Sequence, residues 1–210
     1  VKQYAPNATI ADDSLHTIDS YLTRRPQQRK EPIRDGLDRP YIPGSSIKGA
    51  IRTAVLASIA ATMNDADLRA TRNNGNITAK TFEAKVFGKD PNHDVFRYLL
   101  VGDAFATGYR TAVYNMVNIN ERTERGFWDT SKQMATEVLL CGTEVDFSLV
   151  LKQQELRPID MPAMPKALSS VNALLNVINN HTRTLLADEI DIWESKNVDS
   201  QSEEKVNSYI

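Results

Sequence analysis

The stretch RPYIPGSSIKGAIRT, residues 39–53, combines two glycines, two serines and several cations. Such residues suit three kinds of chemistry: a nucleotide-binding phosphate loop, a serine nucleophile beside a lysine, or a helix start that holds a phosphodiester. A phosphate loop needs Lys and then Ser or Thr directly after its second glycine. Here Ala50 and Ile51 follow Gly49, and Lys48 precedes it. The spacing therefore does not fit a nucleoside triphosphate site.

A serine nucleophile is the second possibility, because Ser45 and Lys48 form an S-x-x-K pair. Penicillin-recognising serine enzymes combine this pair with S-D-N and K-T-G motifs. Neither string occurs in the sequence. A serine hydrolase therefore stays an alternative that rests on a short and common pattern.

A helix start that holds a phosphate is the interpretation we favour. Pro43 and Gly44 suit a tight turn, and Gly44 allows a positive φ or a close approach. Ser45 suits the N-cap position, which would leave the amides of Ser46, Ile47 and Lys48 without intrahelical acceptors. Free amides and the helix dipole attract anions. The stretch therefore predicts a clamp for a phosphodiester.

Cations near this start strengthen the phosphate interpretation. Lys48 and Arg52 are four residues apart and should share one helix face. Gly49 would leave room for close packing or for a ligand. Residues 24–52 contain eight cations, Arg34 among them, against three acids. A capped amphipathic helix that binds nothing explains the same start, so both interpretations remain open.

The remaining pattern predicts an α+β fold. Apolar positions recur at helical spacing over residues 45–63 and 167–193, and a shorter helix fits 78–87. Apolar runs or alternation predict strands over 96–105, 111–119 and 143–151, with a long polar connection over 120–133. Asp103 should cap a turn after its strand.

Composition narrows the function further. The net charge is −2, which hides a basic N-terminal third and an acidic end over residues 188–204. Cys141 is alone and the three histidines are scattered, so we expect no metal or other cofactor, and a reducing cytoplasm. No apolar run reaches the roughly 18 residues that span a bilayer. Since the sequence opens in a polar stretch without Met, we expect residues before it.

Three segments resemble the RAMP superfamily of CRISPR proteins. RPYIPGSSIKGAIRTAVL resembles its P-Y-I-P-G-S-S-[IL]-K-G-x-[IL]-R-T segment, and YLLVGDAF resembles its V-x-D-[AS] strand. VNINERT followed by TEVLLCGTEVDFSL is similar to its I-[DN]-R-x-T and E-x-[VL]-x-x-G-T blocks, although Glu121 stands where the family usually has Arg. The matches span residues 33–151 in family order. Within the superfamily, the first segment most resembles the type III-A Csm subunit that caps the 3′-end side of the crRNA backbone.

The resemblance implies a ferredoxin-like, RRM-type core with insertions over residues 1–160, followed by a helical segment and acidic tail over 161–210. It implies crRNA, target RNA and neighbouring RAMP subunits as partners, and it does not imply catalysis by this subunit. We therefore expect no enzyme activity and no membrane partner. A related backbone subunit cleaves target RNA with a loop aspartate. Asp12, Asp13 and Asp19 cannot be matched to that loop, so the nuclease remains the alternative.

The resemblance also implies a thumb in the long polar connection, directed at the guide–target duplex. Arg122, Arg125 and Trp128 lie there, and an aromatic ring beside arginines can stack on bases. A solvated loop with a packed Trp128 explains the same residues. The predicted RNA-binding residues are therefore Arg34, Gly44, Ser45, Ser46, Lys48, Gly49, Arg52, Arg122, Arg125 and Trp128.

Overall fold

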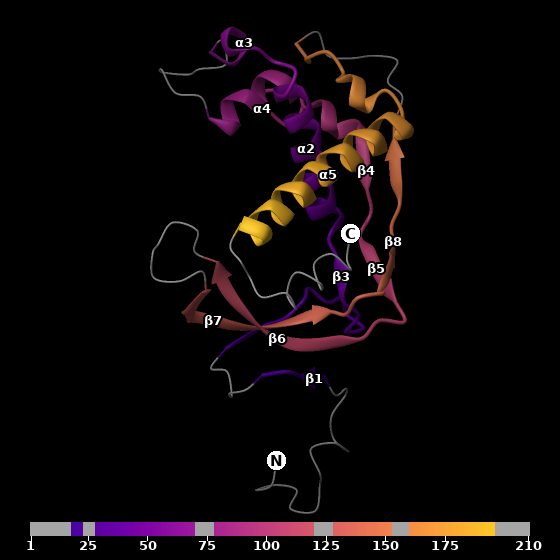
Figure 1. The fold of residues 1–210 in the computed structure, drawn as a ribbon. Helices are drawn as coiled ribbons and strands as arrows, with labels where there is room; N and C mark the ends of the chain where they lie inside the picture. Colours follow the sequence, from indigo (N-terminus) through magenta and orange to yellow (C-terminus); the bar gives the residue numbers. More distant parts are fainter. Residues whose placement is uncertain (1–17, 23–27, 70–77, 120–127, 153–159, 196–210) are drawn as a thin grey trace, which may run out of the picture. The chain divides into compact units, whose positions relative to one another are not determined.

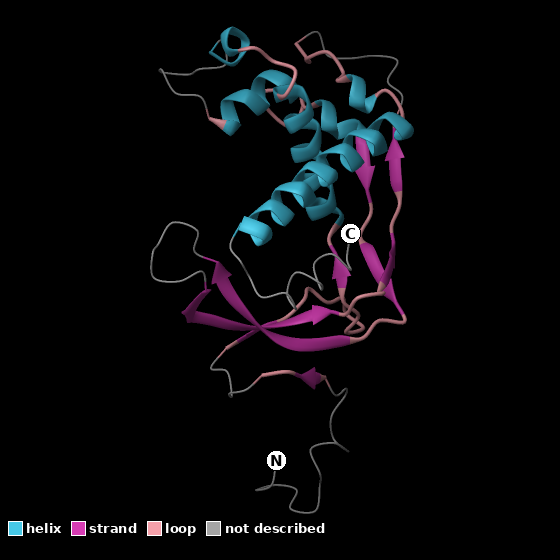
Figure 2. Ribbon diagram, in the orientation of Figure 1, coloured by secondary structure: helices cyan, strands magenta, loops and turns pink. Residues whose placement is uncertain are grey.

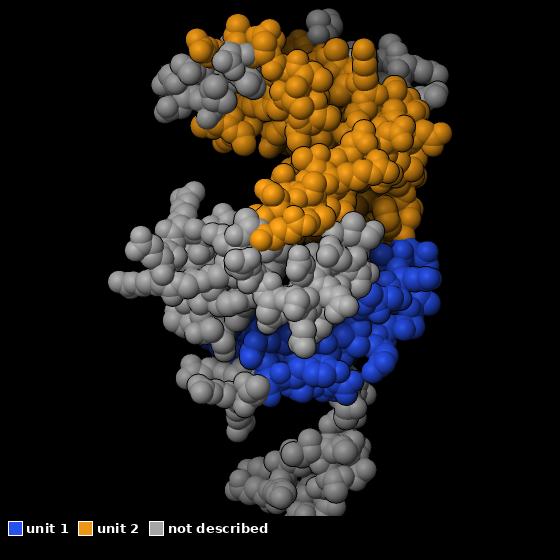
Figure 3. All heavy atoms as spheres, viewed as in Figure 1, with its two compact units in different colours: residues 1–41, 105–146 blue, residues 42–104, 147–210 orange. Residues whose placement is uncertain are grey.

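The computed structural model describes residues 18–22, 28–69, 78–119, 128–152 and 160–195. The chain forms two compact units, each built from two separate stretches (Figure 3). Unit 1 comprises residues 1–41 and 105–146, and unit 2 comprises 42–104 and 147–210. The units thus alternate along the sequence. The division at residue 160 drawn from the sequence stays a prediction.

Unit 1 is built on a four-stranded sheet with the order β1-β6-β7-β2. The antiparallel pair β6 (Thr111–Ile119) and β7 (Trp128–Leu139) forms its centre (Figure 1). Two short strands, β1 (Asp19–Ser20) and β2 (Arg29–Lys30), add in parallel to β6 and β7. Val113 and Ala135 are buried on one face of this sheet, and Ala112 is buried on the other face.

A second, three-stranded sheet has the order β3-β5-β8. It consists of β3 (Tyr41–Ile42), β5 (Ala104–Thr107) and β8 (Glu144–Asp146). Burial alternates along β5, because Ala104 and Ala106 are buried while Phe105 and Thr107 are exposed. This period of two is the pattern of a strand with one packed face.

Unit 2 is mainly helical (Figure 2). Its helices are α2 (Gly44–Ala60), α3 (Asp65–Arg69), α4 (Ala79–Phe87), α5 (Val171–Ser195) and the 3₁₀ turns η1 (Val95–Tyr98) and η2 (Lys166–Leu168). The antiparallel pair β4 (Leu99–Val101) and β9 (Leu149–Leu151) completes it. One hydrophobic core joins α2, α4, α5, the two 3₁₀ turns and the β4–β9 pair, with Val55, Phe87, Phe96, Leu99 and Leu174 almost fully buried.

The α+β class predicted from the sequence is confirmed, and so is the helical character of the C-terminal part. The predicted helix face of α2 is confirmed as well, since Ile51, Ala54 and Val55 are buried. The C-terminal helix α5 buries only part of the apolar repeat that predicted it. Leu174 is buried and Ile178 packs on the core, but Leu175 and Leu185 are exposed. No helix in the described ranges is long and apolar enough to cross a membrane.

Two predicted strands are wrong in extent. Residues 96–105 form η1, β4 and then β5, with a break at Gly102 and Asp103, while 143–151 form β8 and β9 with a break at 147–148. The two breaks face each other, because the Gly102 amide donates to the Ser148 carbonyl at 2.8 Å. The predicted polar connection 120–133 is also wrong, since β7 begins at Trp128. At its start, Trp128 and Asp129 pair with Ile119 and Asn118 of β6.

Candidate nucleic-acid interface

Helix α2 starts at Gly44, and its N-cap is Pro43 rather than the predicted Ser45. Pro43 has the extended backbone of an N-cap (φ −57°, ψ 133°) but no side-chain donor or acceptor to contribute. Its carbonyl accepts from the amides of Ser46 at 2.9 Å and Ile47 at 3.2 Å. Lys48 falls within the regular ladder. The predicted row of free amides at these three residues is therefore wrong.

An internal carboxylate caps the helix instead. The Gly44 amide donates to Asp103 Oδ1 at 2.7 Å, across 59 residues of sequence. Asp103 thus caps a distant helix rather than the local turn that the sequence suggested. A negative charge at this position also complements the helix dipole. The negative charge that caps this helix start is therefore the carboxylate of Asp103, a residue of the protein itself.

Gly44 is required by close packing against a strand end. A Cβ at this position would lie 2.7 Å from the carbonyl carbon and oxygen of Gly102, and closer still to the carbonyl oxygen of Val101. These atoms belong to the backbone and cannot rotate away. The close approach predicted for Gly44 exists, but its partner is β4 and the break that follows. The feature formed by Gly44, Val101, Gly102 and Asp103 is called the helix–strand joint below.

The exposed side of α2 begins directly after the joint. Ser45, Ser46 and Gly49 are exposed, and Ala50 and Thr53 continue the same surface one turn later. A Cβ on Gly49 would meet no atom within 4 Å, so this glycine is not needed for packing within the chain. Close packing at Gly49, one of the two roles considered, is therefore not seen, and room for a ligand stays a prediction.

Lys48 and Arg52 face one open pocket, as their spacing predicts. Arg52 is held in place: Nε contacts Glu83 at 2.9 Å, Nη1 contacts Asp94 at 2.8 Å, and the guanidinium lies over the Phe87 ring at 4.4 Å. Its charge is therefore largely used inside the protein. Burial lowers the pKa of Lys48, while Asp94 acts in the opposite direction and Arg52 adds to the lowering.

The pocket, of about 410 Å³, contains two further cations that sequence reasoning missed. Lys89 contacts Asp160 at 3.7 Å, and both side chains are mostly exposed. Arg97 donates from Nη1 to the Asn92 carbonyl at 2.6 Å and is exposed. Asp90 also lines the pocket, and the hydrogen bond from His93 lowers the pKa of Asp90. Four cations against two acids leave the lining positive.

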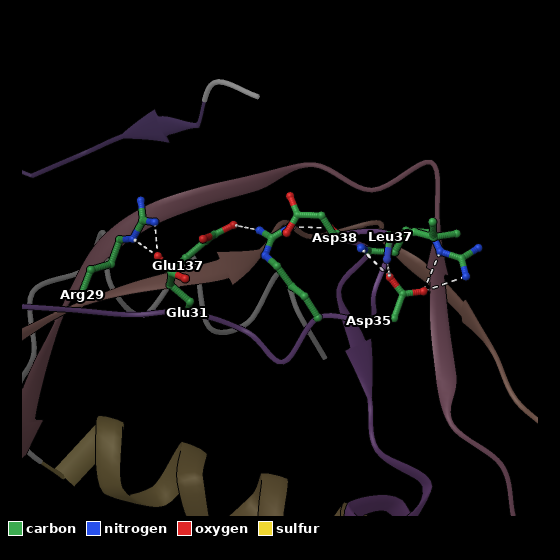
Figure 4. A network of polar contacts seen from close by, with 8 residues as sticks. Arg29, Glu31, Asp35, Leu37, Asp38 and Glu137 are labelled. Carbon is green, nitrogen blue, oxygen red and sulfur yellow. Dashed lines mark hydrogen bonds and ion pairs between the residues drawn. The ribbon is translucent and has the colours of Figure 1, made fainter. Parts of the chain in front are cut away.

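Arg34 has a structural partner in unit 1. Its Nη2 pairs with Glu137 Oε1 and its Nη1 donates to the Asp38 carbonyl at 2.8 Å (Figure 4). Glu137 is 4% exposed, and its Oε2 has no hydrogen-bond partner among the described residues. RNA contact by Arg34 stays a prediction, but most of its guanidinium is committed to the fold.

The other predicted residues are less well described. Arg122 and Arg125 lie outside the described residues, so the thumb stays a prediction. Trp128 is the first residue of β7, where it pairs with Ile119. Within the described ranges, no three or more His, Cys, Asp or Glu side chains gather in a way that could hold a metal ion.

Comparison with known proteins identifies the family. The model of the RAMP superfamily matches residues 12–159. The chain belongs to the RAMP superfamily. A solved relative is Csm5 of T. onnurineus, with 25% identity and a TM-score of 0.53 over 71% of this chain. This RAMP protein spans about half the length of that relative, since the match covers 50% of it.

Two further comparisons add little. A Csm–crRNA–target RNA ternary complex of a type III-A CRISPR–Cas system contains a chain with 25% identity and a TM-score of 0.42, covering 58% of this chain and 39% of that one. We base no argument on this weaker likeness. The comparison with curated proteins found no match.

The segments that resemble the family are joined in the structure of this RAMP protein. In unit 2, the helix–strand joint connects the P-G-S-S segment to the V-x-D strand through Gly44 and Asp103. In unit 1, Arg34, which lies upstream of the first segment, pairs with Glu137 of the E-x-[VL] block. Several residues in or beside the family segments thus stabilise the fold through contacts within the protein.

Proposed function

We propose that this RAMP protein is a non-catalytic, crRNA-binding subunit of a type III-A CRISPR effector (Csm) complex, and that it caps the 3′-end side of the crRNA backbone. Family membership and the likeness to Csm5 support this class of complex. The proposal includes a ferredoxin-like, RRM-type core, neighbouring RAMP subunits and target RNA as partners, and a cytoplasmic location.

The observation that carries RNA binding is the surface beside Lys48. Lys48, Lys89 and Arg97 line a positive pocket, and Ser45, Ser46 and Gly49 of the same helix as Lys48 are exposed. Lys48 is partly desolvated and makes no ion pair with another described residue. A phosphate would offset the cost of that desolvated charge. Such contacts grip the backbone without reading base sequence.

Single-site variants test this surface. Lys48→Ala should weaken RNA binding by about 1 kcal/mol, to the same extent for every RNA sequence. It should also make the slope of log K against log[salt] shallower by roughly 0.7, the contribution of one contact to single-stranded RNA. Lys166→Ala, which removes an exposed lysine of η2, is the matched control. Equal affinity of the Lys48→Ala and Lys166→Ala variants at low salt would contradict the proposal.

The absence of catalysis needs its own experiment. Purified protein is incubated with target RNA and Mg²⁺ or Mn²⁺, and we expect intact RNA. Asp12 and Asp13 lie outside the described residues, and Asp19 contacts Arg110 at 3.4 Å. Cleavage that disappears in Asp12→Ala or Asp13→Ala would establish the nuclease alternative. Labelling of Ser45 by a fluorophosphonate would instead support the serine hydrolase.

A further inference from the structure

One face of the four-stranded sheet in unit 1 carries exposed aromatic and thioether side chains. Along β6, Tyr114 and Met116 are 40% and 55% exposed, and their spacing of two residues places them on the same face. On β7, Met134 pairs with Met116 and Thr136 pairs with Tyr114, so all four share a face. The Thr136 hydroxyl lies 3.0 Å from the Met116 sulfur.

A second tyrosine completes this face. Tyr21 follows β1, and its amide donates to the Val113 carbonyl at 3.0 Å. Its ring stacks on Tyr114 with centroids 4.9 Å apart and planes 16° from parallel. Tyr21 is still 59% exposed, so stacking on Tyr114 leaves most of the Tyr21 side chain accessible. We call Tyr21, Tyr114, Met116 and Met134 the tyrosine platform.

Cations flank the tyrosine platform. Lys30 of β2 pairs with Thr136 and therefore points to the same face, two strand spacings or roughly 10 Å from Tyr114. Lys30 is exposed and has no ion pair with the described residues. Arg110, with a 75% exposed side chain, reaches Asp19 at 3.4 Å. Asp19 lies two residues before Tyr21, so this loose pair borders the platform.

We propose that the tyrosine platform stacks on an unpaired RNA base, with Lys30 and Arg110 beside the neighbouring phosphates. An RNA base can stack on near-parallel tyrosine rings whose surfaces are exposed. Such stacking does not depend on which base is present. Sheet-borne aromatics are a general means of holding single-stranded RNA. The inference rests on the proposed function, but the platform lies in unit 1 and the Lys48 pocket in unit 2.

The cations beside the tyrosine platform suit RNA, whereas acids lie beside a second aromatic pair. A second stacked pair, Tyr41 with Phe105 at 5.4 Å, offers a comparison. Phe105 pairs across the sheet with Asp146 of β8, and Thr107 pairs with Glu144. Those acids would repel phosphate, and Arg39 over the Phe105 ring is already paired with Asp35. The two aromatic pairs should therefore differ in their response to RNA.

Base-dependent affinity tests the platform. The full chain is titrated with single-stranded oligouridine and with an abasic oligonucleotide of equal length and charge. Wild-type protein should prefer the base-containing RNA by roughly five- to a hundredfold, the range for loss of one stacked base. Tyr21→Ala with Tyr114→Ala should remove this preference and leave abasic affinity unchanged. The Phe versions of both substitutions should retain it, and Phe105→Ala is the matched aromatic control.

The possible results separate the inference from the function on which it rests. If wild-type protein binds both oligonucleotides equally, RNA binding stands and the platform is refuted. If neither binds, the proposed function fails as well. If the Ala variants lose assembly into the effector complex but keep their preference for bases, the face docks a protein and the inference is wrong.

Photocrosslinking of the wild-type protein removes any dependence on how well the variants fold. With RNA containing 4-thiouridine, we expect crosslinked peptides that include Tyr21 or Tyr114. Crosslinks confined to other peptides would overturn the assignment.

Discussion

The two glycines of α2 should respond in opposite ways to the same substitution. At Gly49, alanine adds a methyl group that meets nothing within 4 Å. The lower conformational entropy of alanine in the unfolded chain should therefore stabilise the protein by about 0.5–1 kcal/mol. At Gly44, the methyl group would lie 2.7 Å from backbone atoms of Gly102, where ordinary contact begins at 3.4 Å.

Separation of the helix start from the strand is the only relief available to Gly44→Ala. Overpacking of this kind costs about 1–3 kcal/mol. The movement would also weaken the hydrogen bond from Gly44 to Asp103, which adds about 1 kcal/mol. These costs exceed the gain in helix propensity. We therefore expect a net loss of about 1–3 kcal/mol.

Thermal or urea unfolding measures both variants against wild type. For a chain of this size, each kcal/mol shifts Tm by roughly 2–4 °C. Gly44→Ala should therefore lower Tm by about 2–12 °C, while Gly49→Ala should raise it by about 1–4 °C. RNA affinity adds a second readout: Gly49→Ala should weaken binding if a phosphate approaches this surface. A Gly44→Ala variant as stable as wild type would refute the account of the joint.

The remaining predictions concern three charged side chains. Asp103→Ala should cost about 1–2 kcal/mol in unfolding experiments, whereas Asp103→Asn keeps an acceptor for Gly44 and should cost less than half as much. Arg34→Ala leaves Glu137 buried without its partner and should cost about 3–5 kcal/mol, and replacing both residues with Met should recover most of the loss. Burial holds the pKa of Lys48 below 10.5, so its charge destabilises the fold at neutral pH and this effect fades as pH rises through the lowered pKa. Lys48→Met should therefore be more stable than wild type at pH 7, with a difference that shrinks toward pH 10.

Local periodicity predicted the regular elements well. The helices α2 and α4 and the strand β6 lie within a residue or a few of the ranges drawn from the sequence. Each has a hydrophobic repeat of its own. Strand β7 lacks one in its polar first half, where Trp128 and Asp129 pair with Ile119 and Asn118 of β6. That stabilisation is not local, so the sequence pattern does not reveal it.

Long-range pairing limited what could be predicted of the site. Arg34 pairs with Glu137 across 103 residues, and Gly44 bonds to Asp103 across 59. Viewed singly, each of these groups suits RNA contact or turn capping. Lys89 and Arg97 join the pocket because the segment after α4 folds beside α2, which neither composition nor spacing indicates. Carboxylates far away in the sequence hold Arg34 and Arg52 tightly, and spacing within the motif does not reveal such partners.

Some of these residues hold the fold together and others do not, and this difference determines how RNA-binding variants should be interpreted. Gly44 and Asp103 hold α2 against β4, so their substitution can weaken RNA binding simply by moving the helix. Lys48 and Gly49 have no comparable contact and lie on the side of α2 that faces the pocket or solvent. If phosphate binding is the function of this surface, Gly49→Ala should lower affinity while raising stability. A merely structural motif has no means of producing opposite signs in those two measurements.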